Sequence, residues 1–201
     1  MGLSPGGVFE QPDENSTPLT PEEMRDLIPS HIAYRSELNY AELQNIARAQ
    51  AWLFSRRDKE VLSEKFIKNL HRRMLGDVWR WAGKFRTSER NLGIDYWEIP
   101  VAVHQLLANV KAWIEFRAYP ADEIAVRFHH RLVQIHPFPN GNGRHARLVA
   151  DVLAMQLQSP RFTWGRRRSL RDAGVTRRSY IAALQDADHH DIGPLLKFAR
   201  E

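Results

Sequence analysis

The chain of 201 residues is 43% hydrophobic and carries a formal charge of +5 at pH 7, which is typical of a single soluble domain with a substantial core. It contains no cysteine, which excludes disulfide bonds, thiolate metal sites and a cysteine nucleophile. The sequence has neither a run of about 18 apolar residues nor a secretory signal, so we expect a cytoplasmic protein with no membrane contact.

The excess of basic residues suits a polyanionic partner, such as a nucleotide, although charge alone does not choose among anions. The densest basic segment lacks the interleaved aromatic residues of a nucleic-acid groove. We therefore interpret it as a solvated surface and expect no direct nucleic-acid binding. This segment consists of Arg166, Arg167, Arg168, Arg171, Arg177 and Arg178.

The beginning of the chain differs in composition from the rest. Residues 1–30 are rich in proline and small polar residues and show little apolar periodicity, so we expect an irregular N-terminal tail. Residues 31–201 are expected to form a single domain. Its first amphipathic helix is predicted to extend to Phe54, with Asn39 and Glu42 as a capping box.

Helical spacing of apolar residues dominates the remainder of the domain. A second helix is predicted from Leu62 until Gly76 ends it. Between Trp79 and Pro100 the helical period fails and glycines interrupt short extended runs, which predicts a small β-hairpin. Helical spacing returns in residues 103–113, 124–132, 148–153, 180–187 and 195–198. The sequence therefore predicts an all-α, mainly helical fold with one hairpin.

The most informative segment, residues 136–147, reads His-Pro-Phe-Pro-Asn-Gly-Asn-Gly-Arg-His-Ala-Arg. Its Gly-Asn-Gly turn opens a predicted helix, where unpaired N–H groups and the helix dipole attract an anion. Arg144 and Arg147 are three residues apart and therefore lie on one helix face, where both guanidinium groups can bind phosphate oxygens. The segment thus predicts a polyphosphate site.

A histidine stands immediately before this turn. The ordinary pKa of a histidine lies close to neutrality, so His136 can accept a proton as a general base and release it afterwards. Phe138 is expected to point into the core as an anchor, and Pro137 to stiffen the loop. Seven of the twelve positions match the pattern His-x-Phe-x-x-Gly-Asn-Gly-Arg-x-x-Arg, which favours a nucleotide pocket over an accidental glycine turn.

This segment resembles the signature of the Fic (Fic/Doc) family, and within that family the chain is most similar to the set called mobile mystery protein B. The similarity extends from about residue 40 to residue 199, and it includes the segment from Leu70 and His71 to Arg86 that resembles the one leading into the family's flap. The resemblance implies a mainly helical fold with a β-hairpin flap. It also implies transfer of AMP from ATP to a Ser, Thr or Tyr hydroxyl of a target protein.

The resemblance assigns roles by position. The flap that aligns the target segment is expected near Thr87 to Tyr96, and its pairing with the target backbone would make the target sequence matter little. The motif residues have the following expected roles: His136 is the general base, Gly141, Asn142 and Gly143 form the anion cradle, and Arg144 and Arg147 clamp the phosphates.

One position departs from the family's pattern. Asn140 stands where Fic enzymes usually carry Asp or Glu to hold the Mg²⁺ that bridges the ATP phosphates. A neutral amide oxygen can still bind Mg²⁺, but such sites normally retain one or two carboxylates. We therefore expect ATP as substrate and a weakened Mg²⁺ site at Asn140. Lower activity, an ion held mainly by the phosphates, and a different chemistry all stay open.

Many Fic proteins also carry an inhibitory glutamate that pairs with the second motif arginine, which is Arg147 here. The resemblance makes Glu37 the expected inhibitory residue, although Ala33 lacks the hydroxyl that the family's pattern has at that position. Glu42 is the rival candidate, and its predicted capping role already accounts for it.

Three further hypotheses stay open. A nucleotide-binding regulatory module that has lost catalysis is one, because of Asn140. An enzyme that transfers another phosphate-containing group is the second. The third is a metal-dependent hydrolase, which would draw its ligands from His129, His130, His136, His145, His189, His190 and Asp191.

Overall fold

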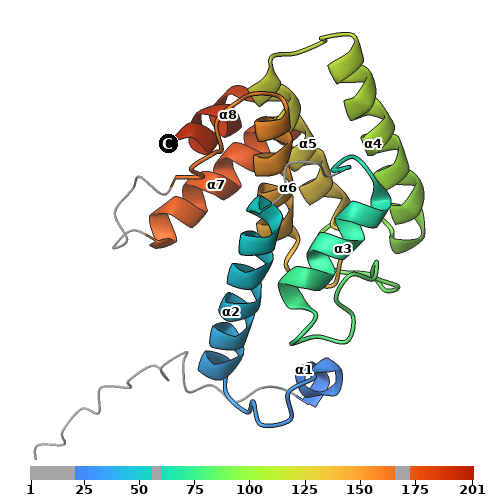
Figure 1. The fold of residues 1–201 in the computed structure, drawn as a ribbon, viewed down its shortest axis with the longest axis vertical. Coiled ribbons are helices and arrows are strands. Elements are labelled where there is room, and N and C mark those ends of the chain that lie inside the picture. Colours follow the sequence, from blue (N-terminus) through green and yellow to red (C-terminus); the bar gives the residue numbers. More distant parts are fainter. Residues whose placement is uncertain (1–20, 56–59, 166–172) are drawn as a thin grey trace, which may run out of the picture.

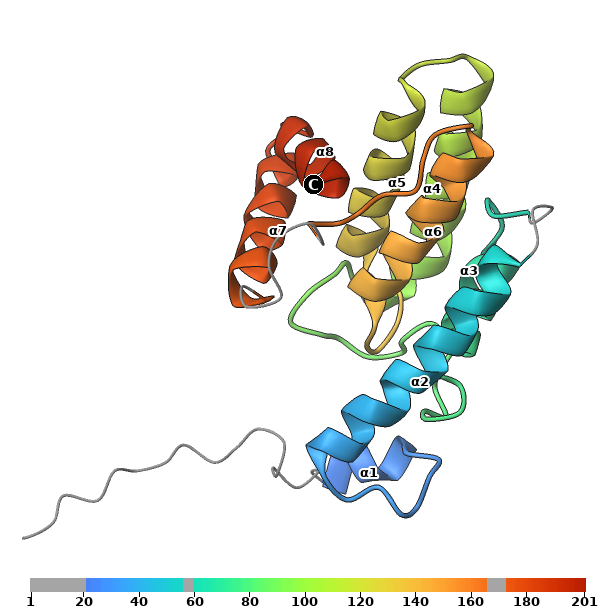
Figure 2. The same ribbon diagram turned by 60° about the vertical axis from the view of Figure 1, so that its left-hand side comes forward.

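The computed structural model describes residues 21–55, 60–165 and 173–201 of the chain. The helical elements are α1 (Pro21–Asp26), α2 (Arg35–Phe54), α3 (Glu64–Leu75), the 3-10 turn η2 (Tyr96–Glu98), α4 (Ile99–Glu115), α5 (Ala121–Ile135), α6 (Asn142–Gln156), α7 (Ala173–Asp188) and α8 (Gly193–Arg200). Helices α5 and α6 form the centre, α7 and α8 lie on one side of them and α4 on the other, and α2 and α3 extend below them towards α1 (Figures 1 and 2). The mainly helical fold predicted from the sequence is confirmed.

The core lies between α5 and α6, which pack against each other more extensively than any other described pair of helices. Ile135 at the end of α5, Phe138 in the connecting loop and Val149 in α6 are completely buried. The expectation that Phe138 anchors the loop in the core is confirmed. Among the described helices, none has the length and hydropathy needed to span a bilayer.

Helix α2 begins four residues before Asn39, so the predicted capping box of Asn39 and Glu42 is wrong. The Glu37 carboxylate instead accepts hydrogen bonds from the backbone N–H groups of Ala33 (2.9 Å) and Tyr34 (3.1 Å). These bonds satisfy donors that a helix start leaves unpaired, and a carboxylate in the first turn also complements the helix dipole. Glu42 is thereby moved into the helix interior, where its side chain is free for contacts with other elements.

The folded part of the chain begins earlier than the sequence indicated. Within residues 1–30, which were expected to be irregular, α1 forms and is followed by an isolated antiparallel bridge between Leu27 and Trp79. The N–H of Ile28 also donates to the carbonyl oxygen of Val78, at 2.8 Å. Leu27 joins the core with 7% of its surface exposed, which explains why this segment is ordered. The part before α1 lies outside the described residues.

Residues 87–95, called the flap below, form an irregular loop that leads into η2, and the predicted β-hairpin is not found there. The Arg86 side chain donates to the carbonyl oxygens of Ser88 (3.1 Å) and Ile94, near the two ends of the loop. A guanidinium group therefore binds acceptors that a hairpin would pair with backbone N–H groups of the opposite strand.

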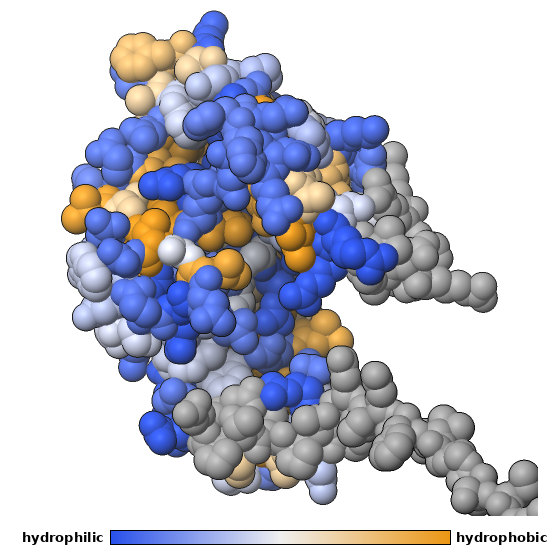
Figure 3. Space-filling model, turned by 180° about the vertical axis from the view of Figure 1, so that it is seen from behind, coloured by the Kyte–Doolittle hydropathy of each residue, from blue (hydrophilic) through white to orange (hydrophobic). Residues whose placement is uncertain are grey.

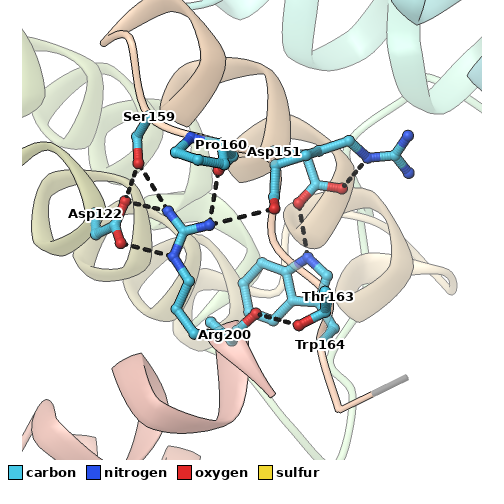
Figure 4. A network of polar contacts seen from close by, with 9 residues as sticks. Asp122, Asp151, Ser159, Pro160, Thr163, Trp164 and Arg200 are labelled. Carbon is cyan, nitrogen blue, oxygen red and sulfur yellow. Dashed lines mark hydrogen bonds and ion pairs between the residues drawn. The ribbon is translucent and has the colours of Figure 1, made fainter. Parts of the chain in front are cut away.

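A polar network fixes α8 to the start of α5 and to the segment after α6 (Figure 4). The Arg200 guanidinium donates from Nε to Asp122 Oδ2 (2.7 Å) and from Nη1 to the carbonyl oxygen of Pro160 (2.8 Å). Its Nη2 donates to Ser159 Oγ (2.8 Å) and also contacts Asp122 Oδ1. The ion pair with Arg200 is the main reason why the pKa of Asp122 is lowered.

A second carboxylate in the same view holds the segment after α6 against the middle of that helix (Figure 4). Asp151 Oδ1 accepts a hydrogen bond from Trp164 Nε1 at 2.8 Å, and its Oδ2 accepts one from Arg161 Nε at 3.3 Å. Burial raises the pKa of Asp151, and these two donors partly oppose that effect. Helices α5, α6 and α8 thus form one connected support behind the loop that carries the motif.

We expect Arg200→Ala to lower the free energy of unfolding by about 2 kcal/mol and Tm by roughly 4 to 8 °C, because it leaves several acceptors without a donor. Since Asp122 has a lowered pKa in the folded state, the pair stabilises above the ordinary pKa of Asp and loses this effect as the pH falls through the folded pKa. The difference in the free energy of unfolding between wild type and Arg200→Ala should therefore become smaller below about pH 4.

Thermal unfolding at pH 7 and at pH 3 measures both effects. Lys197→Ala, on the same helix, is the control, because that ammonium is 80% exposed and lies 4.0 Å from its nearest carboxylate. An equal loss of Tm in the two variants would contradict the role assigned to the network.

Candidate functional site

The predicted base lies at the C-terminal end of α5. His136 is the C-cap residue of this helix, with a left-handed backbone (φ 52°, ψ 58°), and its N–H still donates to the carbonyl oxygen of Leu132 at 3.2 Å. The left-handed turn ends the helix and directs the chain into the loop towards α6. Such a conformation is strained for a residue with a Cβ, so it persists only where neighbouring contacts hold it.

The loop between α5 and α6 is closed by Asn142. The side chain Oδ1 of Asn142 accepts from the Phe138 N–H at 2.9 Å, and its Nδ2 donates to the Phe138 carbonyl oxygen at 2.8 Å. Both polar atoms of this amide are therefore used within the loop, and Asn142 is 3% exposed. The side chain of Asn142 builds the turn, and only its backbone N–H remains available to an anion.

The turn exposes backbone donors at the start of α6. In the described part of the chain, the N–H groups of Asn142, Gly143 and Arg144 have no hydrogen-bond acceptor, as expected for the first turn of a helix. Gly141 has φ +78°, and a Cβ there would lie 2.8 Å from Leu75 Cδ1, so a side chain is excluded by both backbone and space. These donors and the dipole of a 15-residue helix make the turn suitable for an anion.

Arg144 reaches from this turn towards α2. Its Nη1 donates to Glu42 Oε2 at 2.8 Å, and Glu42 Oε1 accepts from Trp79 Nε1, also at 2.8 Å. Glu42 is 7% exposed, so its carboxylate is held between these two donors and is largely shielded from water. The first motif arginine is thus bound to an internal carboxylate, at a position where an incoming phosphate would compete for it.

Arg147 turns back along α6 towards the glycine turn. Its Nε donates to the Gly143 carbonyl oxygen at 3.2 Å, and its guanidinium lies 5.2 Å from the centre of the Tyr180 ring of α7. The Tyr180 hydroxyl is 3.6 Å from where a Cβ of Gly143 would stand, and it contacts Nε2 of the buried His129 at 3.1 Å. The start of α6 therefore lies between α2, through Arg144, and α7, through Tyr180.

The surface of one face is mixed in character. Seen from behind, the described residues expose mainly hydrophilic side chains, with hydrophobic ones between them (Figure 3). Of the basic segment noted in the sequence, Arg177 and Arg178 are exposed on α7, whereas Arg166, Arg167, Arg168 and Arg171 lie outside the described residues.

Asn140, the predicted metal ligand, is exposed at the start of the turn. Its Oδ1 accepts from the Gly141 N–H at 2.6 Å, and its carbonyl oxygen contacts Nε2 of His71 at 3.0 Å. Because His71 Nδ1 accepts from the Gly83 N–H at 2.9 Å, Nε2 carries the proton and donates. Burial is the main cause that lowers the pKa of His71 to about 4, so it holds the loop as a neutral imidazole.

The electrostatic setting of His136 favours the free base. Burial is the largest cause that lowers its pKa, and the charge of Arg86 lowers it further, while a contact with the carbonyl of Val133 raises it. Arg86 Nε donates to the His136 carbonyl oxygen at 2.8 Å. A lowered pKa leaves the imidazole neutral at pH 7, which is the form that accepts a proton.

Other candidates from the sequence are not part of this arrangement. Glu37 lies at the exposed start of α2, where its carboxylate accepts hydrogen bonds from the backbone of Ala33 and Tyr34. The seven residues of the hydrolase hypothesis do not converge, because the described residues contain no group of three or more His, Asp or Glu side chains that could hold a metal ion. His129 and His145 are completely buried instead.

Sequence reasoning missed several residues that shape the site. Glu42 was explained by a capping role that the structure gives to Glu37, and no periodicity indicates that it reaches α6. Arg86 and His71 occur in the segment that leads into the flap, but nothing in their spacing indicates that they bind the carbonyl oxygens of His136 and Asn140. Charged residues are usually exposed to solvent, so the sequence gave no indication that Arg86 is buried.

The chain is similar in sequence to known proteins. Residues 61–154 match the model of the Fic/DOC family. The chain is 31% identical over 144 residues to "Protein adenylyltransferase Fic" from Aedes aegypti, an alignment that covers 69% of this chain and 27% of that protein. It is 28% identical over 147 residues to "Protein adenylyltransferase fic-1" from Caenorhabditis elegans, which covers 71% and 27%. The chain thus spans little more than a quarter of these relatives.

Solved structures share the fold. Fic-1 from C. elegans superposes with a TM-score of 0.61 at 26% identity, covering 81% of this chain and 47% of that one. The BepC protein from Bartonella tribocorum, solved with bound AMPPNP, superposes with a TM-score of 0.66 over 90% of this chain and 97% of that one, and its 14% identity shows the fold alone. With the motif, the helical fold and these matches in agreement, the chain belongs to the Fic/DOC family, and the matched domain is residues 61–154.

Proposed function

We propose that this protein is a protein adenylyltransferase, which transfers AMP from ATP to a Ser, Thr or Tyr hydroxyl of a target protein. The observation that carries the proposal is the combination of a neutral, half-buried His136 with the unpaired N–H groups and two arginines at the start of α6. The relatives named as adenylyltransferases support the same reaction class.

In the proposed reaction, the triphosphate binds at the glycine turn, with Gly143 and the two motif arginines contacting its oxygens. The imidazole of His136 takes the proton of the target hydroxyl as that oxygen attacks the α-phosphorus. A new oxygen–phosphorus bond forms, the bond to the β-phosphate oxygen breaks, and pyrophosphate leaves. The products are the target with AMP on its hydroxyl and pyrophosphate, and the histidine releases its proton afterwards.

Binding of Mg²⁺ requires a separate test, because the expected protein ligand, Asn140, is neutral. Asn140 Oδ1 is bound to the Gly141 N–H, although an amide oxygen has a second lone pair for an ion. A divalent ion would neutralise charge on the phosphates, and Mg²⁺ sites of this kind commonly use one or two carboxylates together with substrate phosphates. We propose that the nucleotide, rather than the protein, provides most ligands for Mg²⁺ here.

We expect intact mass spectrometry, after incubation with ATP and Mg²⁺, to show addition of AMP to the protein or to a supplied target. His136→Ala should lower the rate by about 10² to 10⁴, the usual contribution of a general base, without weakening ATP binding. Asn142 is a poor alternative target for substitution because it closes the loop. ATP binding without any AMP adduct in the wild type would favour the nucleotide-binding regulator instead, and an adduct of another mass would indicate another transferred group.

Asn140→Asp tests whether a neutral side chain at this position weakens the binding of Mg²⁺. A carboxylate at this position can accept from the Gly141 N–H as the amide does, and it adds the charge that Mg²⁺ prefers. We expect roughly tenfold faster transfer at limiting Mg²⁺, equal to about 1.4 kcal/mol, and a lower Mg²⁺ concentration at half the maximal rate. Asn140→Ala serves as the opposite control. If Asn140→Asp leaves the Mg²⁺ dependence unchanged, the ion does not bind at this residue.

We further propose that the glutamate that restrains the site is Glu42 rather than Glu37. Its contact with Arg144 supports this choice, since a phosphate that needs the same guanidinium must displace it. Glu42→Gln keeps an acceptor for Trp79 Nε1 but removes the charge. We expect it to raise AMP transfer about 2- to 5-fold, in line with the modest strength of a pair that includes a partly exposed arginine.

The matched variant Glu37→Gln should leave the rate near that of the wild type, because its carboxylate binds the backbone at the start of α2. Self-modification by labelled ATP measures both variants. A rise in the Glu37 variant without a rise in the Glu42 variant would restore Glu37 as the inhibitory residue.

A further inference from the structure

Arg86 is a charged residue buried at the base of the flap, with 3% of its surface exposed. Its guanidinium donates to three main-chain carbonyl oxygens, those of His136, Ser88 and Ile94. The nearest carboxylate is that of Glu89, at 3.7 Å from Nη1, and it is 54% exposed. A buried cation is costly unless it is well bonded, so the position of Arg86 depends mainly on these neutral carbonyls.

The main chain of Arg86 is bound to the same loop as its side chain. Its N–H donates to the carbonyl oxygen of Pro137 at 2.9 Å, beside the contact of Nε with the His136 carbonyl oxygen. Two further nitrogens of the guanidinium bind Ser88 and Ile94, which lie near opposite ends of the flap. One residue therefore connects the strained backbone at His136 with both ends of the flap.

The flap also contacts His136 directly. Gly93 has φ +108°, and a Cβ at this position would stand 2.6 Å from the Cβ of His136 and 2.7 Å from Nη2 of Arg86. Side chains other than hydrogen are thus excluded both by the backbone and by this close approach. The flap can lie against His136 only because position 93 is glycine.

We infer that Arg86 is a positioning residue: it holds the flap closed against the main chain of His136, so that the imidazole and the target-aligning loop keep one relative position. This inference rests on the proposed AMP transfer for its effect on rate. Its structural part, the coupling of the flap to His136, is independent of which group is transferred.

Arg86 also acts on His136 through its charge. After burial, this charge is the second cause that lowers the pKa of His136, and the carbonyl of Val133 opposes it. Removal of the charge therefore raises the pKa of His136. A larger fraction of the imidazole is then protonated at a given pH, and the acid limb of the rate profile moves to higher pH.

The test compares Arg86→Lys, which keeps the charge but loses the planar fork, with Arg86→Gln, which loses both. Arg127→Gln is the matched control, because that arginine pairs with Glu123 on α5, away from the loop. Three quantities are measured in the full chain: the pH profile of AMP transfer from labelled ATP, the titration of His136 by NMR, and hydrogen exchange of residues 88–94.

We expect both Arg86 variants to exchange faster in the flap and to lose about 100-fold in the plateau rate, since a displacement near 1 Å has that effect. Only Arg86→Gln should raise the pKa of His136 and shift the acid limb. ATP binding should change little, and the control should match the wild type. Normal exchange and titration in a folded Arg86→Gln variant, with or without a lower rate, would overturn the inference.

If Arg86→Gln does not fold, Gly93→Ala provides the test, because it keeps Arg86 and places a Cβ against His136. We expect faster exchange of the flap and a lower transfer rate, and an unchanged flap would overturn the inference. A wild type that transfers no AMP refutes the proposed function alone, since titration and exchange still report whether Arg86 couples the flap to His136.

Discussion

The site depends on one closed loop, in which the amide of Asn142 exchanges two hydrogen bonds with the backbone of Phe138. These bonds set the entry of the chain into α6, and the buried ring of Phe138 fixes the loop from below by stacking on His71, with ring centres 3.7 Å apart. The free N–H groups of the turn and the left-handed His136 both follow from this closure. A change in the conformation of this loop would therefore displace His136 and the glycine turn together.

A second constraint is electrostatic. Two arginines at the N-terminal end of a helix oppose the helix dipole, and such a cluster is stabilised by an anion. Glu42 provides one internal negative charge by contacting Arg144, whereas the backbone donors of the turn have no acceptor among the residues that the structure describes. The protein thus pairs one of the two arginines with its own carboxylate. In the proposed reaction, this arrangement would link nucleotide binding to a contact between α2 and α6.

The sequence predicted the elements that repeat with a period, and the residues of one contiguous motif. The helices containing Leu148 and Leu106, the end of α3 at Gly76 and the burial of Phe138 all follow from local patterns. Contacts between distant segments left no such signal. Glu42 reaches Arg144 across 102 positions of the chain, and no pattern within α2 indicates this partner.

The flap is a second case in which local sequence patterns did not predict the structure. Glycines and short extended runs favoured a hairpin, but the structure has an irregular loop because the Arg86 side chain binds carbonyl oxygens near both ends of it. Local propensity indicates the conformation that a segment prefers in isolation. In the folded protein, the buried side chain of Arg86 binds the flap backbone and favours an irregular loop. The start of α2 was also misplaced, because Glu37 rather than Glu42 binds the backbone N–H groups at the start of this helix.

The binding of polyphosphate at the start of α6 is tested most directly by a crystal structure of the protein with a non-hydrolysable ATP analogue and Mg²⁺. We expect phosphate oxygens within hydrogen-bond distance of the Gly143 N–H and of the Arg147 guanidinium, with the imidazole of His136 beside the α-phosphorus. A nucleotide bound elsewhere, with no phosphate oxygen near the Gly143 N–H and the imidazole directed away from the phosphates, would contradict the assignment of this site.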